Sequence, residues 1–112
     1  MNGHYRREPR YPFVATAEVC DERTTSTIGA RLGDLSLSGC FIRMISPLPK
    51  GSMISIRVSA GTSVFYARGQ VVNSQPGRGV GVEFQEIEPR YLAVLEEWLL
   101  EAKNLNTTDS FV

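Results

Sequence analysis

A period-two alternation of apolar and polar residues recurs along most of this chain and constrains its fold more than any other feature. Segment 54–59, ISIRVS, shows it most clearly, with apolar residues on one face and polar residues on the other. Residues that favour turns separate the alternating runs, as in DERTT, SPLPKGS, SAGTS and NSQPGRG. The pattern predicts six β-strands, at 13–19, 28–33, 40–45, 54–59, 64–73 and 80–84.

The short connections between these segments indicate how the strands pair. Parallel neighbours need a crossover connection of a dozen or more residues, usually a helix, and no helical pattern lies between the six segments. The strands are therefore expected to be antiparallel. Six short antiparallel strands predict a mainly β fold, a six-stranded antiparallel β-barrel.

One C-terminal α-helix is predicted after the last strand. Pro89 suits the first position of a helix, although Glu88 before it is a mediocre cap. The apolar residues at helical spacing are Tyr91, Leu92, Leu95, Trp98, Leu99 and Ala102. This stripe favours a helix that covers an open end or face of the barrel. The alternative is a helix that also contributes to a partner interface.

Length and charge exclude several classes of protein. The 112 residues suit one domain with a single modest core. Twelve basic residues balance twelve acidic residues, so no overall field attracts the chain to nucleic acid or to an anionic membrane. No secretory h-region is present, and no segment approaches the ~20 apolar residues of a membrane helix. We therefore expect a cytoplasmic protein without membrane insertion.

Few residues could support metal or redox chemistry. Cys20 and Cys40 lack a CxxC spacing, and His4 is the one histidine. Because these residues form no zinc pattern, we expect no metal and no cofactor. For the two cysteines, buried free thiols are favoured over a disulfide, which stays open as an alternative.

The N-terminal segment RREPR concentrates positive charge ahead of the first strand. It holds Arg6, Arg7 and Arg10, three of the ten arginines in a chain with only two lysines. A guanidinium group offers a planar fork of donors that matches phosphate oxygens and the O6 and N7 acceptors of guanine. The segment is therefore a candidate anion-binding arm, and a solvated tail is the alternative.

A second polar cluster, DLSLSGCF, lies between two predicted strands. An ordinary β-turn explains it, because Asp34, Ser36 and Ser38 can bond to nearby backbone and Gly39 can supply a positive φ angle. The Asp34 carboxylate can also accept hydrogen bonds from paired N–H donors, such as those on the Watson–Crick edge of guanine. Together the two segments would form complementary halves of a site for guanine and phosphate.

These segments resemble the motifs of a known family. RREPR fits the RxxxR motif and DLSLSG fits the [DN]xSxxG motif of PilZ domains, which are bacterial receptors for cyclic di-GMP. The later GVGVEF and the closing amphipathic helix are similar to the usual end of that family. The resemblance covers about Arg6 to Leu100. Each motif is short, but their order and separation make the combination specific.

The resemblance implies roles for individual residues in binding cyclic di-GMP. Arg6 and Arg10 would be the principal contacts of the arm, and Arg7 would be an added phosphate or base contact. In the second motif, Asp34 and Ser36 would hydrogen-bond a guanine, and Gly39 would permit the turn and a close approach of the backbone.

The resemblance also implies a domain organisation and a mode of signalling. We expect a flexible N-terminal arm over residues 1–10, a PilZ-like barrel with its helix over residues 11–104 and a polar tail over residues 105–112. A stand-alone receptor of this kind would signal to a downstream effector protein when the ligand orders the arm. Monomer and homodimer both stay open.

Three other functions are alternatives to this one. A scaffold for protein interactions could have the same fold without nucleotide binding. A single-stranded nucleic-acid-binding small barrel is disfavoured, because following a phosphate backbone requires several cations and the net charge is zero. An enzyme is not expected, because a serine nucleophile needs a positioned base and the one histidine lies near the N-terminus.

Overall fold

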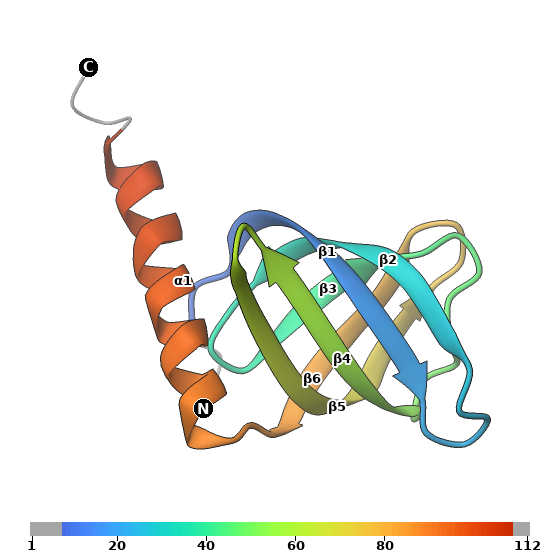
Figure 1. Ribbon diagram of the computed structural model, residues 1–112. Coiled ribbons are helices and arrows are strands. Elements are labelled where there is room, and N and C mark those ends of the chain that lie inside the picture. The colour runs from blue at the N-terminus through green and yellow to red at the C-terminus, as the bar shows by residue number, and fades with distance from the viewer. Residues whose placement is uncertain (1–7, 109–112) are drawn as a thin grey trace, which may run out of the picture.

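The alternating segments form a closed barrel of six strands followed by one helix (Figure 1). The computed structural model describes the backbone of residues 8–108 and the side chains of residues 8–105. Its elements are β1 (Tyr11–Asp21), β2 (Thr27–Leu35), β3 (Gly39–Arg43), β4 (Met53–Ala60), β5 (Ser63–Gln75), β6 (Gly79–Glu86) and α1 (Pro89–Thr108). The prediction of a mainly β, six-stranded antiparallel barrel with a C-terminal helix is confirmed.

The strands follow the order β1-β2-β3-β6-β5-β4 around the barrel, and β4 pairs with β1 to close it. Every pairing is antiparallel. Closure leaves none of the six described strands with an open edge for pairing with another chain. The same order places β6 beside β3, although β4 and β5 separate these two strands in the sequence.

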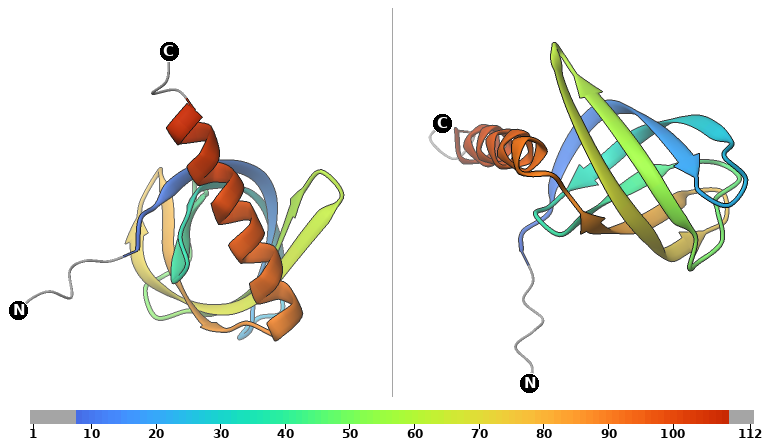
Figure 2. Two further views of the ribbon diagram at one scale, coloured as in Figure 1. Left: turned by 90° about the vertical axis from the view of Figure 1, so that its left-hand side faces the viewer. Right: turned by 60° about the horizontal axis from the view of Figure 1, so that its bottom comes forward.

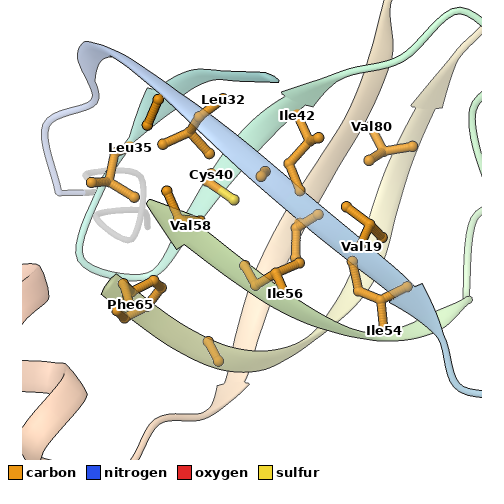
Figure 3. Packing of buried hydrophobic residues seen from close by; sticks show 14 of the residues in the cluster. Val19, Leu32, Leu35, Cys40, Ile42, Ile54, Ile56, Val58, Phe65 and Val80 are labelled. Carbon is orange, nitrogen blue, oxygen red and sulfur yellow. The ribbon is translucent and has the colours of Figure 1, made fainter. Parts of the chain in front are cut away.

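The period-two pattern places one face of each strand inside the barrel. In β4, Ile54, Ile56 and Val58 are buried, whereas Ser55 between them is exposed. Side chains from several strands meet in the interior, including Val19 of β1 and Phe65 of β5 (Figure 3). Burial of these aliphatic and aromatic groups supplies the main favourable free energy of folding.

The strand limits differ from the sequence prediction by one or two residues, and two of these differences have a visible reason. β1 begins at Tyr11 rather than residue 13, because Tyr11 pairs with Leu35 of β2. β3 ends at Arg43 rather than residue 45, because the next residues bond to the turn between β5 and β6. The Met44 N–H donates to the Arg78 carbonyl at 3.1 Å, and the Ile45 carbonyl accepts from the Gly77 N–H at 3.1 Å.

α1 crosses one open end of the barrel (Figure 2). Leu95, Trp98 and Ala102 are its buried residues, and the Trp98 ring stacks on Phe13 of β1 with 5.1 Å between centroids. Trp98 also lies 6.2 Å from the ring of Phe65. The expectation that the helix covers an end of the barrel is therefore confirmed.

The helix continues to Thr108, four residues past the expected limit of the folded domain at residue 104. No glycine or proline interrupts residues 101–108, so nothing in the sequence ends the helix at that limit. Within the described chain, no helix is long and apolar enough to span a membrane.

We predict that Trp98→Ala destabilises the protein far more than Leu100→Ala, although both residues lie on α1. Trp98 is 4% exposed and Leu100 is 60% exposed. Loss of the buried indole should lower the free energy of unfolding by about 3–5 kcal/mol, whereas loss of the exposed leucine should change it by under ~1 kcal/mol. Urea denaturation of the two variants measures both values. Equal losses would show that the helix does not stabilise the barrel through Trp98.

Candidate functional site

A β-bulge in β2 directs Asp34 to the outer face of the barrel. Leu32 pairs with Ile42 and Asp34 pairs with Phe41, so Gly33 is an extra residue between two consecutive pairs. A bulge redirects the side chains that follow it. Leu32 and Leu35 are consequently both buried, although strict alternation would place them on opposite faces. Asp34 lies outside the core as a result, beside Phe41.

The turn after β2 is held by the side chain of Ser36. The Ser36 hydroxyl accepts hydrogen bonds from the Ser38 and Gly39 N–H groups at 3.3 and 3.2 Å, and it donates to the Gly39 carbonyl at 3.2 Å. Ser36 is also 1% exposed. A hydroxyl has one donor hydrogen and two acceptor lone pairs. Hydrogen bonds within the turn therefore use the full hydrogen-bonding capacity of the Ser36 hydroxyl. The predicted contact of Ser36 with a base stays a prediction.

Gly39 is required by a close contact between strands. It pairs with Glu83 of β6, and a Cβ at this position would collide with the Val82 carbonyl oxygen. The glycines with a positive φ are Gly51, Gly61, Gly77 and Gly79. The turn explanation that gave Gly39 a positive φ was therefore wrong. The absence of a side chain, rather than the backbone conformation, makes glycine necessary here.

Arg10 lies against Asp34 at the start of β1. Pro12 pairs with Asp34, so the residues just before β1 pass beside the end of β2. Arg10 Nη2 is 3.1 Å from Asp34 Oδ1, with the two side chains 49% and 35% exposed. This ion pair is not aligned as a hydrogen bond. Among the described residues, the buried Oδ1 atom has no hydrogen-bond donor.

Glu8 also contacts the turn. The Ser38 hydroxyl donates a hydrogen bond to Glu8 Oε1 at 2.9 Å. The last residues of the expected arm thus already touch the second motif. Arg6 and Arg7, the other two predicted contacts of the arm, lie outside the described residues.

These residues surround a cavity of about 600 Å³ on the outer face of the barrel. Phe41 of β3 pairs with Gly81 of β6, so a side chain faces a position that has none. This leaves a hollow beside the Phe41 ring. The lining residues are Glu8, Arg10, Asp34, Ser36, Ser38, Gly39, Phe41, Val72, Asn73, Gln75, Gly81, Val82 and Glu83. The cavity brings together Arg10, Asp34, Ser36 and Gly39 of the predicted site.

The described lining of this cavity carries more negative than positive charge. Glu8, Asp34 and Glu83 contribute three carboxylates, whereas Arg10 contributes the single cation among the described lining residues. Such a surface suits a group that presents hydrogen-bond donors. A phosphate would need further cations.

A thiol lies in the core beneath the site. Burial, and to a lesser extent the nearby Asp34 carboxylate, raise the pKa of Cys40 to about 12, while Arg10 partly opposes both effects. The thiol therefore stays neutral and is unsuited to act as a nucleophile. Cys20 and Cys40 are both free thiols, as expected, but only Cys40 is buried and Cys20 is partly exposed.

Sequence reasoning missed the part of the site that comes from β3 and β5. Phe41, Asn73 and Gln75 line the cavity but belong to neither motif. For Phe41 a signal was available. Cys40 and Ile42 are apolar and belong to the inward face of β3, so alternation places the aromatic ring of Phe41 outside. For Asn73 and Gln75 no local pattern indicates that they lie near the motifs.

Solved structures share this fold. The PilZ domain of YcgR from Escherichia coli, solved with c-di-GMP, is 18% identical with a TM-score of 0.72, covering 95% of this chain and 97% of that chain. YcgR from Escherichia coli in complex with c-di-GMP is 22% identical with a TM-score of 0.74 over 96% of this chain, which spans 51% of that chain. The PilZ domain of CeSA from a cellulose synthesizing bacterium is 16% identical with a TM-score of 0.63, covering 88% of this chain and 98% of that chain.

At these identities, the solved structures establish the fold alone. No curated protein matches the chain. The model of the PilZ domain family matches residues 4–101, most of the sequence. This match spans the barrel, the cavity and most of the helix, and the chain therefore belongs to the PilZ domain family.

Proposed function

We propose that this protein is a receptor for cyclic di-GMP and that the ligand occupies the cavity beside Asp34. One observation carries the proposal. Asp34 Oδ1 is a buried carboxylate oxygen without a hydrogen-bond donor among the described residues, and it lines an open cavity. An unsatisfied buried polar atom costs about 1–3 kcal/mol. A ligand that brings a donor to this atom would recover that free energy.

Guanine supplies suitable donors for Asp34. Its Watson–Crick edge carries adjacent N–H groups that a carboxylate can accept as a pair. The neighbouring Phe41 ring, half-buried on the outer face, offers a surface on which the base can stack. Relatives of the same fold were solved with c-di-GMP, which supports the same class of ligand here.

Arginines of the RxxxR segment would hold the rest of the ligand. In this proposal, Arg10 turns from Asp34 towards O6 and N7 of guanine or towards a phosphate oxygen. Arg6 and Arg7 would supply the cations that the described lining lacks, since Arg10 alone faces three carboxylates there.

Ser36 and Gly39 would act through the shape of the turn. The Ser36 hydroxyl fixes the chain reversal that follows Asp34, and Gly39 allows β3 to lie close to β6. Both residues would thereby position Asp34 and Phe41 for the ligand.

The receptor would pass its signal to an effector protein in the cytoplasm through the N-terminal segment. Arg10 and Glu8 already contact Asp34 and Ser38 through exposed side chains. A ligand that engages the arginines would change this surface and shift the population of arm conformations that a partner recognises.

We predict that the protein binds cyclic di-GMP in preference to cyclic di-AMP. Adenine carries an amino donor where guanine has O6, so an arginine donor would be left unpaired, at a cost of about 1–3 kcal/mol or roughly tenfold or more in affinity. Isothermal titration with both dinucleotides measures the ratio. Asp34→Asn should reduce it, because the amide is a weaker acceptor of paired donors. Equal affinities of the wild-type protein would refute recognition of guanine.

We predict that Arg6→Ala and Arg10→Ala weaken binding of cyclic di-GMP severely without unfolding the barrel. A hydrogen bond to a charged group contributes about 1.5–3 kcal/mol, and each arginine would make more than one. Lysine at either position should restore binding only in part, because it lacks the fork of donors.

Three measurements control this experiment. Arg23→Ala removes the same charge from the β1–β2 turn, away from the cavity, and should bind as the wild type does. Ile56→Ala removes a side chain that is 1% exposed and should lower the melting temperature strongly. If Arg10→Ala lowered the melting temperature as much as Ile56→Ala, its effect on binding would be a consequence of unfolding.

We predict that cyclic di-GMP slows hydrogen exchange across residues 4–12. The segment 1–10 carries three arginines and one glutamate, a charge of about +2 by this count, and ligand phosphates would remove the repulsion among the arginines. Pro9 and Pro12 restrict the backbone and reduce the entropy lost on ordering. Exchange measured by mass spectrometry with and without ligand tests this. Equally strong protection in the free protein would indicate a preformed site and a different route for the signal.

A further inference from the structure

A second cavity adjoins the first on the outer face of the barrel, and the two together form a groove. The second cavity has a volume of about 530 Å³ and shares Asp34, Phe41 and Gln75 with the first cavity. Its remaining lining includes Arg43 at the end of β3 and Arg78 in the turn between β5 and β6. That turn lies at the opposite end of the barrel from α1 (Figure 1).

The backbone holds the two arginines on neighbouring segments. Arg43 pairs with Gly79, the residue after Arg78, and the Arg78 carbonyl accepts a hydrogen bond from the Met44 N–H at 3.1 Å. Gly79 has a φ of 150°, and a Cβ there would collide with the Ile42 carbonyl oxygen. The contact between β3 and this turn therefore requires glycine, and it holds the backbones of Arg43 and Arg78 on adjacent segments.

Gly33 makes room for the Arg43 side chain. A Cβ at Gly33 would lie 3.3 Å from Arg43 Nε and 3.5 Å from Phe41 Cδ2. The bulge glycine that turns Asp34 outward thus also lets Arg43 and Phe41 lie close over β2. One structural feature consequently shapes both cavities.

The charge of the second cavity is opposite to that of the first. Arg43 and Arg78 are exposed, and within residues 8–105 neither forms an ion pair. Arg31 of β2 pairs directly with Arg43, which places two cations side by side on the outer face. Like charges in directly opposite positions are destabilising. A bound anion would remove that repulsion.

We infer that Arg43 and Arg78 form a second phosphate-binding subsite, continuous with the cavity at Asp34. This inference rests on the proposed function. The acidic first cavity suits the donors of a guanine, and the basic second cavity suits a phosphodiester, with Phe41 between them. The phosphodiester belongs either to the same cyclic dinucleotide, which then spans both cavities, or to a second molecule of it.

The test compares the double variant Arg43→Ala/Arg78→Ala with the wild type by isothermal titration with cyclic di-GMP. We expect loss of the two guanidinium groups to weaken binding about tenfold or more, or to abolish one of two binding events. Arg23→Ala, which also removes an exposed arginine, should leave affinity and stoichiometry unchanged. Melting temperatures should be alike, because both replaced arginines are exposed.

The stoichiometry distinguishes the two sources of the phosphate. Two ligands on the wild type and one on the double variant would identify a second molecule. One ligand on both proteins, bound more weakly by the variant, would identify a single molecule that spans the groove. Unchanged affinity and stoichiometry would overturn the inference while leaving the proposed function intact.

If the wild type binds no cyclic di-GMP, the proposed function is refuted, and a separate probe is needed to test the phosphate subsite. The probe is 5′-GMP, added to ¹⁵N-labelled protein. Changes in the amide resonances of Gly77 and Arg78 that are absent in Arg43→Ala would support the phosphate subsite. No change at these amides in the wild type would refute the subsite as well.

Discussion

The extra residue at Gly33 is the constraint on which the rest of the outer face depends. Closing a six-stranded barrel fixes the register of every pair of strands, so a side chain can change face only where the ladder is interrupted. With the bulge, Leu32 and Leu35 both enter the core and Asp34 stays outside. Without it, the alternation would turn the Asp34 carboxylate inward, where an unpaired charge is strongly unfavourable.

Glycines lie on the outer faces of β3 and β6, opposite the core residues of the same strands. The inner faces of β3 and β6 carry large core residues such as Ile42 and Val80 (Figure 3). On the outer face, a Cβ at Gly39 would collide with the backbone of β6, and Gly81 presents no side chain opposite Phe41. Stability thus resides mainly inside the barrel and the proposed recognition surface outside. Residues of the groove can therefore differ among proteins of this fold without disturbing the core.

The sequence predicted the elements well because the physical signals for them are local. Alternation identified all six strands, and the apolar stripe from Tyr91 to Ala102 identified the helix. The site was only partly predictable. Asp34 belongs to a recognisable motif, but a bulge has no periodic signal, so its consequence for Asp34 was hidden. Arg43 and Arg78 are far apart in the chain, and the pairing of β3 with β6 brings them together. Arg6 and Arg7 lie outside the described residues, and their role stays a prediction.

The weakness of the contact between Arg10 and Asp34 is consistent with a surface that exchanges partners. Both side chains are partly exposed, and an ion pair in such a setting contributes about 0–1 kcal/mol. A fully buried, well-aligned pair would cost several times more to separate. Because Asp34 Oδ1 lacks an aligned donor among the described residues, the proposed ligand would replace the arginine at little cost and add hydrogen bonds to that atom. In the proposed mechanism, the same exchange would release Arg10, whose fork of donors would then become available to the ligand.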